Sequence, residues 1–335
     1  MLLDIFHNDA FSVLSLTDAI LKVPYKPSRI GDLGLFRSRG VTTTTAMIEE
    51  KDGRLSLIQS SPRGGPASTI GAQKRRARAF VISHLEREST VLADEIQNVR
   101  AFGSQTEVDT VAALVGERLT DLRAMHEVTQ EHLRAGAIQG IILDANGDTI
   151  YNLFTEFGVG QQTATVSPNP STDEGDALRA EVVAIQRQIE SELGAEPISG
   201  YHAFCGAEFF DTLRADLGVT QSLRWADPQS LLQQNANARM FQFAGVTWEE
   251  YRTSSAVGSF FATDEAYVFP EGTGYFVTYF APADFIETVN TIGLPVYAKL
   301  AYDDELNRWV KIHTQSNPLS LCLRPRIVVK TTLTT

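Results

Sequence analysis

One stretch of the sequence carries the residue types of a zinc protease. The segment His126-Glu127-Val128-Thr129-Gln130-Glu131-His132 combines two histidines with two glutamates. A zinc protease helix needs its two histidines four residues apart, so that both imidazoles point the same way and bind one ion. Gln130 stands at that position here, and His132 lies two residues further on, rotated well around the helix. The spacing therefore predicts polar residues on a solvated or intersubunit helix face.

The other patterns that could carry chemistry are also incomplete. The segment 144–148 (Asp-Ala-Asn-Gly-Asp) has Thr149 where a calcium loop needs its glycine, so a β-hairpin turn is the better interpretation. The glycine pairs lack the Lys-Ser/Thr of a phosphate loop and the third glycine of a dinucleotide site. The remaining histidines are scattered singly: His7, His84, His202 and His313. We predict no catalytic residue, no cofactor and no metal ion.

The composition limits the classes of protein that fit. A chain of 335 residues is long enough for two domains, and a net charge of -12 argues against a protein that holds nucleic acid through phosphate contacts. Cys205 and Cys322 lie far apart among apolar neighbours, which predicts two buried thiols in a reducing cytosol. The sequence has neither the basic start of a signal peptide nor an apolar run of ~20 residues for a membrane span. We expect a cytosolic protein with no membrane partner.

A long amphipathic helix over residues 106–135 is the strongest structural signal. Thr106 is a good N-cap, and Gly136 is predicted to end the helix. About 30 residues at 1.5 Å each span roughly 45 Å, which is long for a compact enzyme domain. We expect a continuous helix with one face on a β layer formed partly by residues 294–332. Apolar or near-apolar side chains at steps of three and four define that face: Val108, Val111, Val115, Leu119, Leu122, His126, Thr129 and Leu133.

The segments before this helix have few bulky core residues. Two prolines, Pro24 and Pro27, disfavour helix, so residues 1–30 predict an extended arm with one short amphipathic turn around 15–21. Residues 35–58 predict strand, Asp-Gly turn and strand, followed by a loop and a further strand at 79–85. A basic cluster precedes that strand and is expected to be solvated or to pair with a neighbour's carboxylates, with nucleic acid as the alternative. It comprises Lys74, Arg75, Arg76 and Arg78.

After the long helix, helical and strand signals are mixed, which predicts an α+β fold. Gly194 and Gly218 are expected to end two of the helices. The expected elements are a hairpin at 138–154, a polar linker at 161–173, helices at 176–193 and 207–217, strands at 199–205, 240–248, 266–269 and 275–280, and a β-rich tail at 294–332.

The order of these parts resembles the Hong Kong 97-type fold of tailed-phage shell proteins, and the chain is similar to the major capsid proteins of the phage lambda type, the capsid E family. The resemblance covers nearly the whole chain, but it is a pattern of segments and not one sharp motif. The family has no catalytic residues to carry over. The local matches are Arg75-Arg76-Ala77-Arg78-Ala79-Phe80, Gly200-Tyr201-His202-Ala203-Phe204-Cys205-Gly206-Ala207-Glu208-Phe209-Phe210, Phe243-Ala244-Gly245-Val246 and Glu265-Ala266-Tyr267-Val268-Phe269-Pro270.

The resemblance implies a domain organisation and a set of intersubunit contacts. The parts would be an N-terminal arm (1–34), an E-loop (35–88), a P-domain with a spine helix (89–172), an A-domain (173–290) and returning P-domain strands (291–335). The arm is expected to be ordered only in the assembly, so that deleting residues 1–22 would leave a folded subunit. The expected contact residues are Leu2, Ile5, Phe6, Phe11 and Leu14 of the arm, together with Lys74, Arg75, Arg76 and Arg78.

The implied function is self-assembly into hexamers and pentamers that form an icosahedral head around double-stranded DNA, which is enclosed and not read by sequence. A separate scaffolding protein is expected, because the chain starts directly with the arm. A portal is also expected, and a decoration protein is left open. Assembly would take place in the host bacterial cytoplasm and end in the virion. The alternatives are another self-assembling phage component, such as a tail tube or sheath protein, and a cytosolic enzyme of unknown type.

Overall fold

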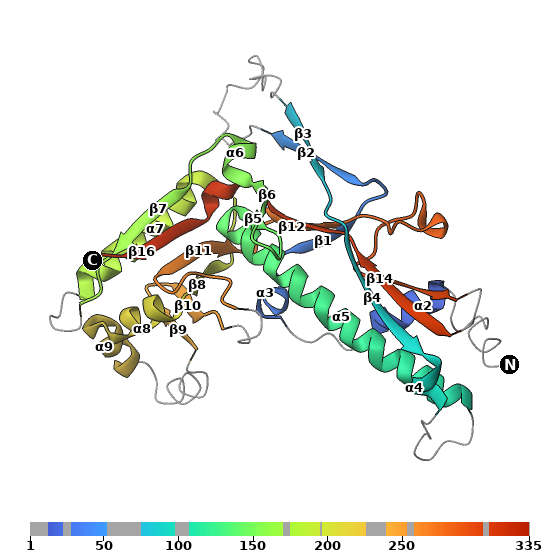
Figure 1. Cartoon of the computed structure of the whole chain (residues 1–335). Coiled ribbons are helices and arrows are strands. Elements are labelled where there is room, and N and C mark those ends of the chain that lie inside the picture. Colours follow the sequence, from blue (N-terminus) through green and yellow to red (C-terminus); the bar gives the residue numbers. More distant parts are fainter. Residues whose placement is uncertain are drawn as a thin grey trace, which may run out of the picture. The chain divides into compact units, whose positions relative to one another are not determined.

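By its internal contacts the chain divides into two compact units, and each unit is built from three separate segments. Figure 1 labels the helices and strands along the chain. Unit 1 comprises Met1–Ile48, Arg78–Glu131 and Thr278–Ser320, and unit 2 comprises Glu49–Ala77, His132–Val277 and Leu321–Thr335. Each passage of the chain from one unit to the other lies inside a helix or a strand. The computed structural model describes residues 13–22, 28–51, 75–97, 107–169, 175–194, 196–225, 239–252, 258–303 and 308–334.

The core of unit 1 lies between helix α5 (Glu107–Gln139) and an antiparallel sheet with the strand order β13-β14-β4. Val115, Leu119 and Leu122 of α5 are buried against apolar side chains of β13 and β14. The prediction of one continuous helix lying on a β layer from the C-terminal tail is confirmed. The strands are β4 (Leu85–Leu92), β13 (Tyr297–Tyr302) and β14 (Trp309–Ser316).

A short N-terminal helix, α2 (Val13–Lys22), completes this core. Leu16 and Ile20 are buried in the same apolar cluster as α5 and β13, and the amide of Ala298 donates to Thr17 Oγ1 at 3.3 Å. Helix α2 confirms the short amphipathic segment predicted around 15–21. The expectation that the arm is ordered only in the assembly is wrong for these residues, because they pack on their own subunit. The burial of Leu16 and Ile20 also argues against a folded subunit after deletion of residues 1–22, because each buried Leu or Ile contributes about 1.5–3 kcal/mol.

Unit 1 also contains short elements before α5. Helix α3 (Arg29–Asp32) is held at its start by Glu131 of α5, whose carboxylate accepts from the amides of Ile30 and Gly31 at 2.6 and 3.3 Å. The sequence predicts one strand over residues 79–85. In the structure β3 (Arg75–Val81) ends within this range and β4 begins at Leu85. The Asp52-Gly53 turn, the strand expected at 55–58 and the N-cap Thr106 lie outside the described residues. The remaining elements are β1 (Arg37–Gly40), α4 (Ala93–Gln97), and the paired strands β2 (Thr45–Lys51) and β3 (Arg75–Val81), of which residues 49–51 and 75–77 belong to unit 2.

Strands β12 (Phe276–Phe280) and β15 (Pro318–Cys322) form a three-stranded sheet with β1 at one edge. The strand predicted at 275–280 is confirmed. The turn predicted at Asn317-Pro318 is wrong, because Asn317 alone separates β14 from β15 and Pro318 begins β15. Both strands are almost fully buried.

Unit 2 is organised around a six-stranded mixed sheet with the order β7-β16-β11-β8-β10-β9. Phe204, Phe209, Trp248 and Phe269 are fully buried beside it. The strands are β7 (Gln162–Val166), β8 (Gly200–Cys205), β9 (Met240–Phe243), β10 (Val246–Glu250), β11 (Glu265–Glu271) and β16 (Val329–Leu333). The helices are α6 (Leu153–Phe157), α7 (Gly175–Leu193), α8 (Ala207–Ala215) and α9 (Leu217–Trp225).

Several predictions for unit 2 are confirmed. The hairpin is formed by β5 (Ile141–Leu143) and β6 (Thr149–Asn152), with Gly147 at φ 88° in its turn. Gly194, at φ 71°, ends α7 as predicted. Cys205 and Cys322 are both buried free thiols, and burial raises the pKa of Cys322 to about 12.

Two predicted boundaries in unit 2 are wrong. Residues 162–166 are not a linker but strand β7, which pairs in parallel with β16. The helix predicted at 207–217 breaks at Asp216, because Asp216 Oδ1 accepts from the amide of Val219 at 3.0 Å and starts α9. Gly218 therefore lies inside a helix and does not end one.

Helix α5 also continues past its predicted end. It runs to Gln139, and Gly140, at φ 83°, follows it. Gly136 lies inside the helix where the backbone of the hairpin approaches closely. A Cβ at Gly136 would lie 2.9 Å from the carbonyl oxygen of Ile141 and 3.0 Å from Cα of Ile142.

This difference predicts opposite effects for two glycine substitutions in the same helix. Gly136→Ala should lower the free energy of unfolding by about 1–3 kcal/mol, because the added methyl group overpacks the approach of residues 141–142. Gly116→Ala has no heavy atom within 4 Å of its added Cβ, so it should raise stability by about 0.4–1 kcal/mol. Urea unfolding of the unassembled subunit measures both. Equal effects of the two substitutions would contradict the packing role of Gly136.

Candidate functional site

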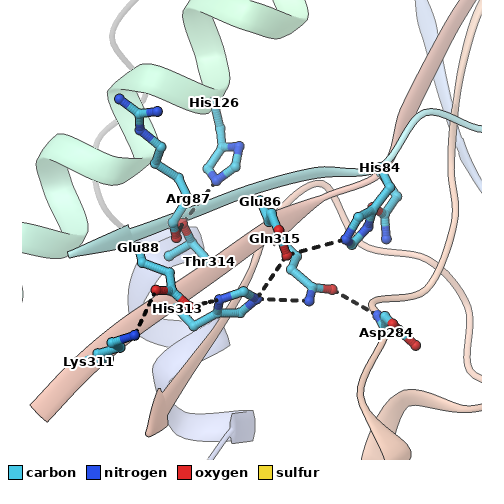
Figure 2. A network of polar contacts seen from close by, with 11 residues as sticks. His84, Glu86, Arg87, Glu88, His126, Asp284, Lys311, His313, Thr314 and Gln315 are labelled. Atoms are coloured by element: carbon cyan, nitrogen blue, oxygen red, sulfur yellow. Dashed lines mark hydrogen bonds and ion pairs between the residues drawn. The ribbon is translucent and has the colours of Figure 1, made fainter. Parts of the chain in front are cut away.

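The segment with zinc-protease residue types is a structural part of α5. His126 is buried, and its Nε2 lies 2.9 Å from Thr314 Oγ1 on β14 (Figure 2). Thr314 Oγ1 donates in turn to the carbonyl of Arg87 at 3.0 Å, so His126 must carry its proton on Nε2. Burial, with the charges of Arg87 and His313 nearby, lowers the pKa of His126 to about 4. His126 is therefore a neutral core histidine at physiological pH.

The polar neighbours of His126 are also engaged within the subunit. Gln130 Nε2 donates to Ser316 Oγ at 3.0 Å, and Arg123 Nε donates to Glu127 Oε1 at 2.7 Å. His126, Glu127, Gln130 and Glu131 are all buried. The prediction of a solvated or intersubunit face is wrong for these residues, because α3, β14 and Arg123 of α5 itself supply internal partners for their polar atoms.

Unit 2 contains a second buried histidine with the opposite electrostatics. His202 on β8 lies between two carboxylates, with 3.0 Å from Nε2 to Glu249 Oε2 and 3.1 Å from Nδ1 to Glu271 Oε1. Burial alone would lower the pKa of His202, but its hydrogen bonds to Glu249 and Glu271 outweigh burial and raise it. This group joins β8 to its two neighbours, β10 and β11. It is a structural ion cluster inside a sheet.

The described residues contain no group of three His, Cys, Asp or Glu side chains placed to hold a metal ion. Over the same residues, no helix has both the length and the apolar character that a membrane span requires.

The contact residues predicted from the sequence fall mostly outside the described part of the chain. Leu2, Ile5, Phe6, Phe11 and Lys74 lie beyond it, and of Leu14, Arg75 and Arg76 only the backbone is described. Leu14 belongs to α2, whereas Arg75 and Arg76 belong to β3. Arg78, also on β3, is half-buried. Their role between subunits stays a prediction.

A surface that the sequence analysis missed lies between β12 and β13. The segment 284–294, here called the apolar loop, exposes the side chains of Ile286 (92%), Ile292 (66%), Val289 (63%) and Leu294 (37%). Exposed apolar side chains gathered in one segment mark interaction surfaces. The spacing of Ile286, Val289 and Ile292 could have drawn attention to this loop, because it fits no strand and sits in a segment rich in turn residues.

The apolar loop is held firmly at its base while its apolar side chains face outward. Thr288 Oγ1 donates to the carbonyl of Ala283 at 2.7 Å, and the amide of Gly293 donates to the carbonyl of Val41 at 2.9 Å. Gly293 has no room for a side chain, because a Cβ there would collide with the carbonyl of Phe280. Glu287 pairs with Lys299 of β13 at 2.8 Å. The loop is thus positioned by its own chain before any partner binds.

A second group of exposed apolar side chains lies on β2 and β3. Met47 is 64% exposed and Val81 is 61% exposed, whereas Ile48 and Phe80 beside them are buried. The two strands therefore have an inner apolar face and an outer face that also carries apolar side chains.

A polar face of β4 and β14 lies at the base of the apolar loop (Figure 2). Gln315 Oε1 accepts from the amide of Asp284 at 2.8 Å, and His313 Nδ1 lies 3.0 Å from Glu88 Oε1. The hydrogen bonds of Glu88 to His313 and Lys311 lower the pKa of that carboxyl group. These residues join the loop to the sheet that carries α5.

Solved structures define the class of protein to which this fold belongs. The fold is the Hong Kong 97-type fold of phage capsid proteins. The capsid of Myoviridae phage XM1 matches with a TM-score of 0.51 and 9% identity, over 93% of this chain and 95% of that chain. A protein of a prophage from E. coli CFT073 matches with a TM-score of 0.50 and 12% identity, over 96% and 99%. The α+β fold class predicted from the sequence is confirmed.

Sequence comparison then identifies the family. The model of the family described as phage major capsid protein E matches residues 12–333, and the chain belongs to this family. Curated relatives named major capsid protein include one from Salmonella phage Felix O1 (isolate Felix O1-VT1), 23% identical over 95% of both chains, and one from Pseudomonas phage KPP10, 27% identical over 96% of both chains. The protein is a capsid-forming structural protein, as the sequence predicted.

The buried neutral state of His126 predicts a specific sensitivity to acid. Its pKa in the folded chain, about 4, lies below the unperturbed value of about 6.5. The unfolded chain therefore takes up a proton first, and stability falls as the pH drops from about 6.5 towards 4. In His126→Gln, whose amide can also donate to Thr314, this loss should disappear. Between pH 7 and pH 4.5 the wild type should lose about 2–3 kcal/mol more unfolding free energy than the variant. Identical losses in urea titrations would contradict a neutral His126.

Proposed function

We propose that the chain self-assembles into hexamers and pentamers that tile an icosahedral phage head around double-stranded DNA. Membership of the capsid family supports the shell-forming role, and the exposed apolar surfaces support contacts between copies. Net charge of -12 fits this role, because a negative wall repels packaged DNA and lets it move during filling. The protein is proposed to act without catalysis, in the virion, after assembly in the host bacterial cytoplasm.

The apolar loop is the observation that carries the proposal. A side chain as large as isoleucine that is 92% exposed gains about 1.5–3 kcal/mol when it is buried. Ile286, Val289 and Ile292 are held outward by a base of backbone hydrogen bonds, so little loop entropy is lost when a partner covers them. In a shell, the partner that is always available is another copy of the chain.

The domain organisation remains part of the proposal. Residues 35–88 are proposed as the E-loop, with Met47 and Val81 as contact residues on β2 and β3. Residues 89–172 and 291–335 are proposed as the P-domain, and 173–290 as the A-domain. The arm is proposed to comprise residues 1–34, with its segment before α2 reaching a neighbour through Leu2, Ile5, Phe6 and Phe11. Lys74, Arg75, Arg76 and Arg78 are proposed to meet carboxylates of an adjacent subunit.

Other partners follow from the geometry of a closed shell. Hexamers and pentamers require one chain to adopt two local curvatures, and we propose that a separate scaffolding protein guides this choice. A portal would replace one pentamer, and a decoration protein is an open addition. DNA would be enclosed and not bound by sequence.

Negative-stain electron microscopy of the chain, co-expressed with the neighbouring genes of its genome, tests the assembly directly. Closed shells with hexamers and pentamers are expected. Tubes or contractile sheaths would favour a tail component, and a small uniform oligomer would contradict both.

The apolar loop predicts a substitution that separates folding from assembly. Ile286→Glu places a charge where an apolar contact is expected, so closed shells should fall at least tenfold in yield while the subunit stays folded. Ile286→Val is the matched control and should assemble like the wild type. Circular dichroism of the unassembled subunits verifies folding, and sedimentation measures shells. Normal shells from Ile286→Glu would show that this loop is not a contact surface.

A further inference from the structure

One amide side chain ties the base of the apolar loop to β14, and its orientation is fixed. The amide of Asp284 donates to Gln315 Oε1 at 2.8 Å. A backbone N–H can only donate, so the oxygen of Gln315 must face Asp284 and its nitrogen must face the other way. Gln315 Nε2 lies 2.9 Å from Nε2 of His313 (Figure 2). Since an amide nitrogen donates and does not accept, His313 Nε2 must accept and carry no proton.

The second ring nitrogen completes this assignment. His313 Nδ1 lies 3.0 Å from Glu88 Oε1 and donates to that carboxylate. The anchored loop therefore requires a neutral imidazole at His313, with its proton on Nδ1.

Charged groups lie on every element packed against His313. The two carboxylates of β4 lie on either side of the ring, with 4.0 Å from His313 Nε2 to Glu86 Oε2. Both lysines nearby are already paired, Lys311 with Glu88 and Lys299 with Glu287. Glu86 is thus placed to accept from Nε2 once that nitrogen carries a proton. The groups are Glu86 and Glu88 of β4, Lys311 of β14, Lys299 of β13, and Asp284 and Glu287 of the loop, with His84 beyond Glu86.

Protonation of His313 breaks this arrangement. A proton on Nε2 would face the amide N–H groups of Gln315 at 2.9 Å, donor against donor, so Gln315 must turn away. Turning the amide removes the acceptor of the Asp284 N–H. Histidine is the side chain whose charge changes between pH 5 and 8. We propose that His313 and Gln315 form a proton-operated anchor: the neutral imidazole holds the base of the apolar loop, and the protonated imidazole releases it.

This inference rests on the proposed function only for its effect on assembly. Release of the loop is a property of the single subunit. In a shell, acidification would loosen the surface that contacts the next copy and would change shell formation or shell stability.

His84, a neighbouring histidine, provides an internal control, because its hydrogen-bond partners differ from those of His313. Asn317 Nδ2 donates to the carbonyl of Pro282 at 2.7 Å, so Asn317 Oδ1 accepts from His84 Nδ1 at 2.8 Å. The other ring nitrogen of His84, Nε2, lies 3.6 Å from Glu86 Oε2. A proton added there leaves the bonds to Asn317 and Pro282 intact. His84 therefore holds the other side of the loop base in both charge states.

Hydrogen–deuterium exchange of the full-length, unassembled subunit at pH 7.5 and pH 5.5 tests the anchor. After correction for the intrinsic pH dependence of exchange, a peptide spanning 283–294 should exchange about five- to tenfold faster at pH 5.5. A peptide spanning the β5–β6 hairpin should not change.

Three variants isolate the residues responsible. His313→Gln keeps an acceptor for Gln315 that does not titrate, so its loop should stay protected at both pH values. Gln315→Met lacks the acceptor for Asp284, so its loop should exchange fast at both. His84→Gln should respond to pH like the wild type.

A wild-type loop with no pH response would overturn the proposal, and so would a full response in His313→Gln. If that variant does not fold, Gln315→Met decides: a loop that still responds to pH there would overturn the anchor. Shell formation is measured in parallel by light scattering. If the loop responds as expected but shells form equally at both pH values, the anchor stands and its role in assembly is wrong. If neither the chain alone nor its co-expression with the neighbouring genes yields shells at any pH, the proposed function fails, and the exchange result still decides the anchor.

Discussion

The contact between α5 and β14 is the one on which the rest of unit 1 depends. Its first half is apolar, through Val115 and Leu119, and any register would bury such a surface. Its second half pairs His126 with Thr314 and Gln130 with Ser316. Four residues of helix rise about 6 Å, and two residues of strand rise about 6.6 Å, so both pairs form in one register only. A slip of one turn would leave buried polar groups unpaired, at about 1–3 kcal/mol each.

The same register determines which side chains of β14 point away from α5. Since side chains alternate along a strand, placing Thr314 and Ser316 towards α5 turns His313 and Gln315 away from it. One side of the strand thus faces His126 of α5, which burial keeps neutral, and the other side carries His313 between two carboxylates. The apolar loop joins the second side. Its base is therefore positioned by the helix packing, although no atom of α5 has to touch it.

The parts of the fold that depend on local sequence could be predicted. Three features depend only on residues that are close in the sequence, and the structure has all of them. They are the apolar spacing of α5, the Asn146-Gly147 turn and the end of α7 at Gly194. The parts that depend on distant pairing could not. Strand β7 has the composition of a linker and becomes a strand because it pairs with β16, more than 160 residues later.

The candidate surfaces follow the same division. The family, and with it the shell-forming role, was accessible from the order of the segments. The anchor at His313 was not, because its partner Glu88 is 225 residues away in the sequence. The prediction that Gly136 ends α5 is wrong for a related reason. A glycine that is needed because the backbone of Ile141 approaches closely looks the same in the sequence as a glycine that ends a helix.

The division of each unit into three segments has a consequence for the order in which the protein is made. Ile20 of helix α2 leaves the ribosome about 280 residues before Val296, Ala298 and Ile312, with which it packs. Contacts of such long sequence separation form slowly. During most of translation, the apolar faces of α2 and α5 have no β layer to cover them. The nascent chain therefore carries exposed apolar surface until β13 and β14 emerge, and this is the interval in which premature association, or protection by a folding helper, would take effect.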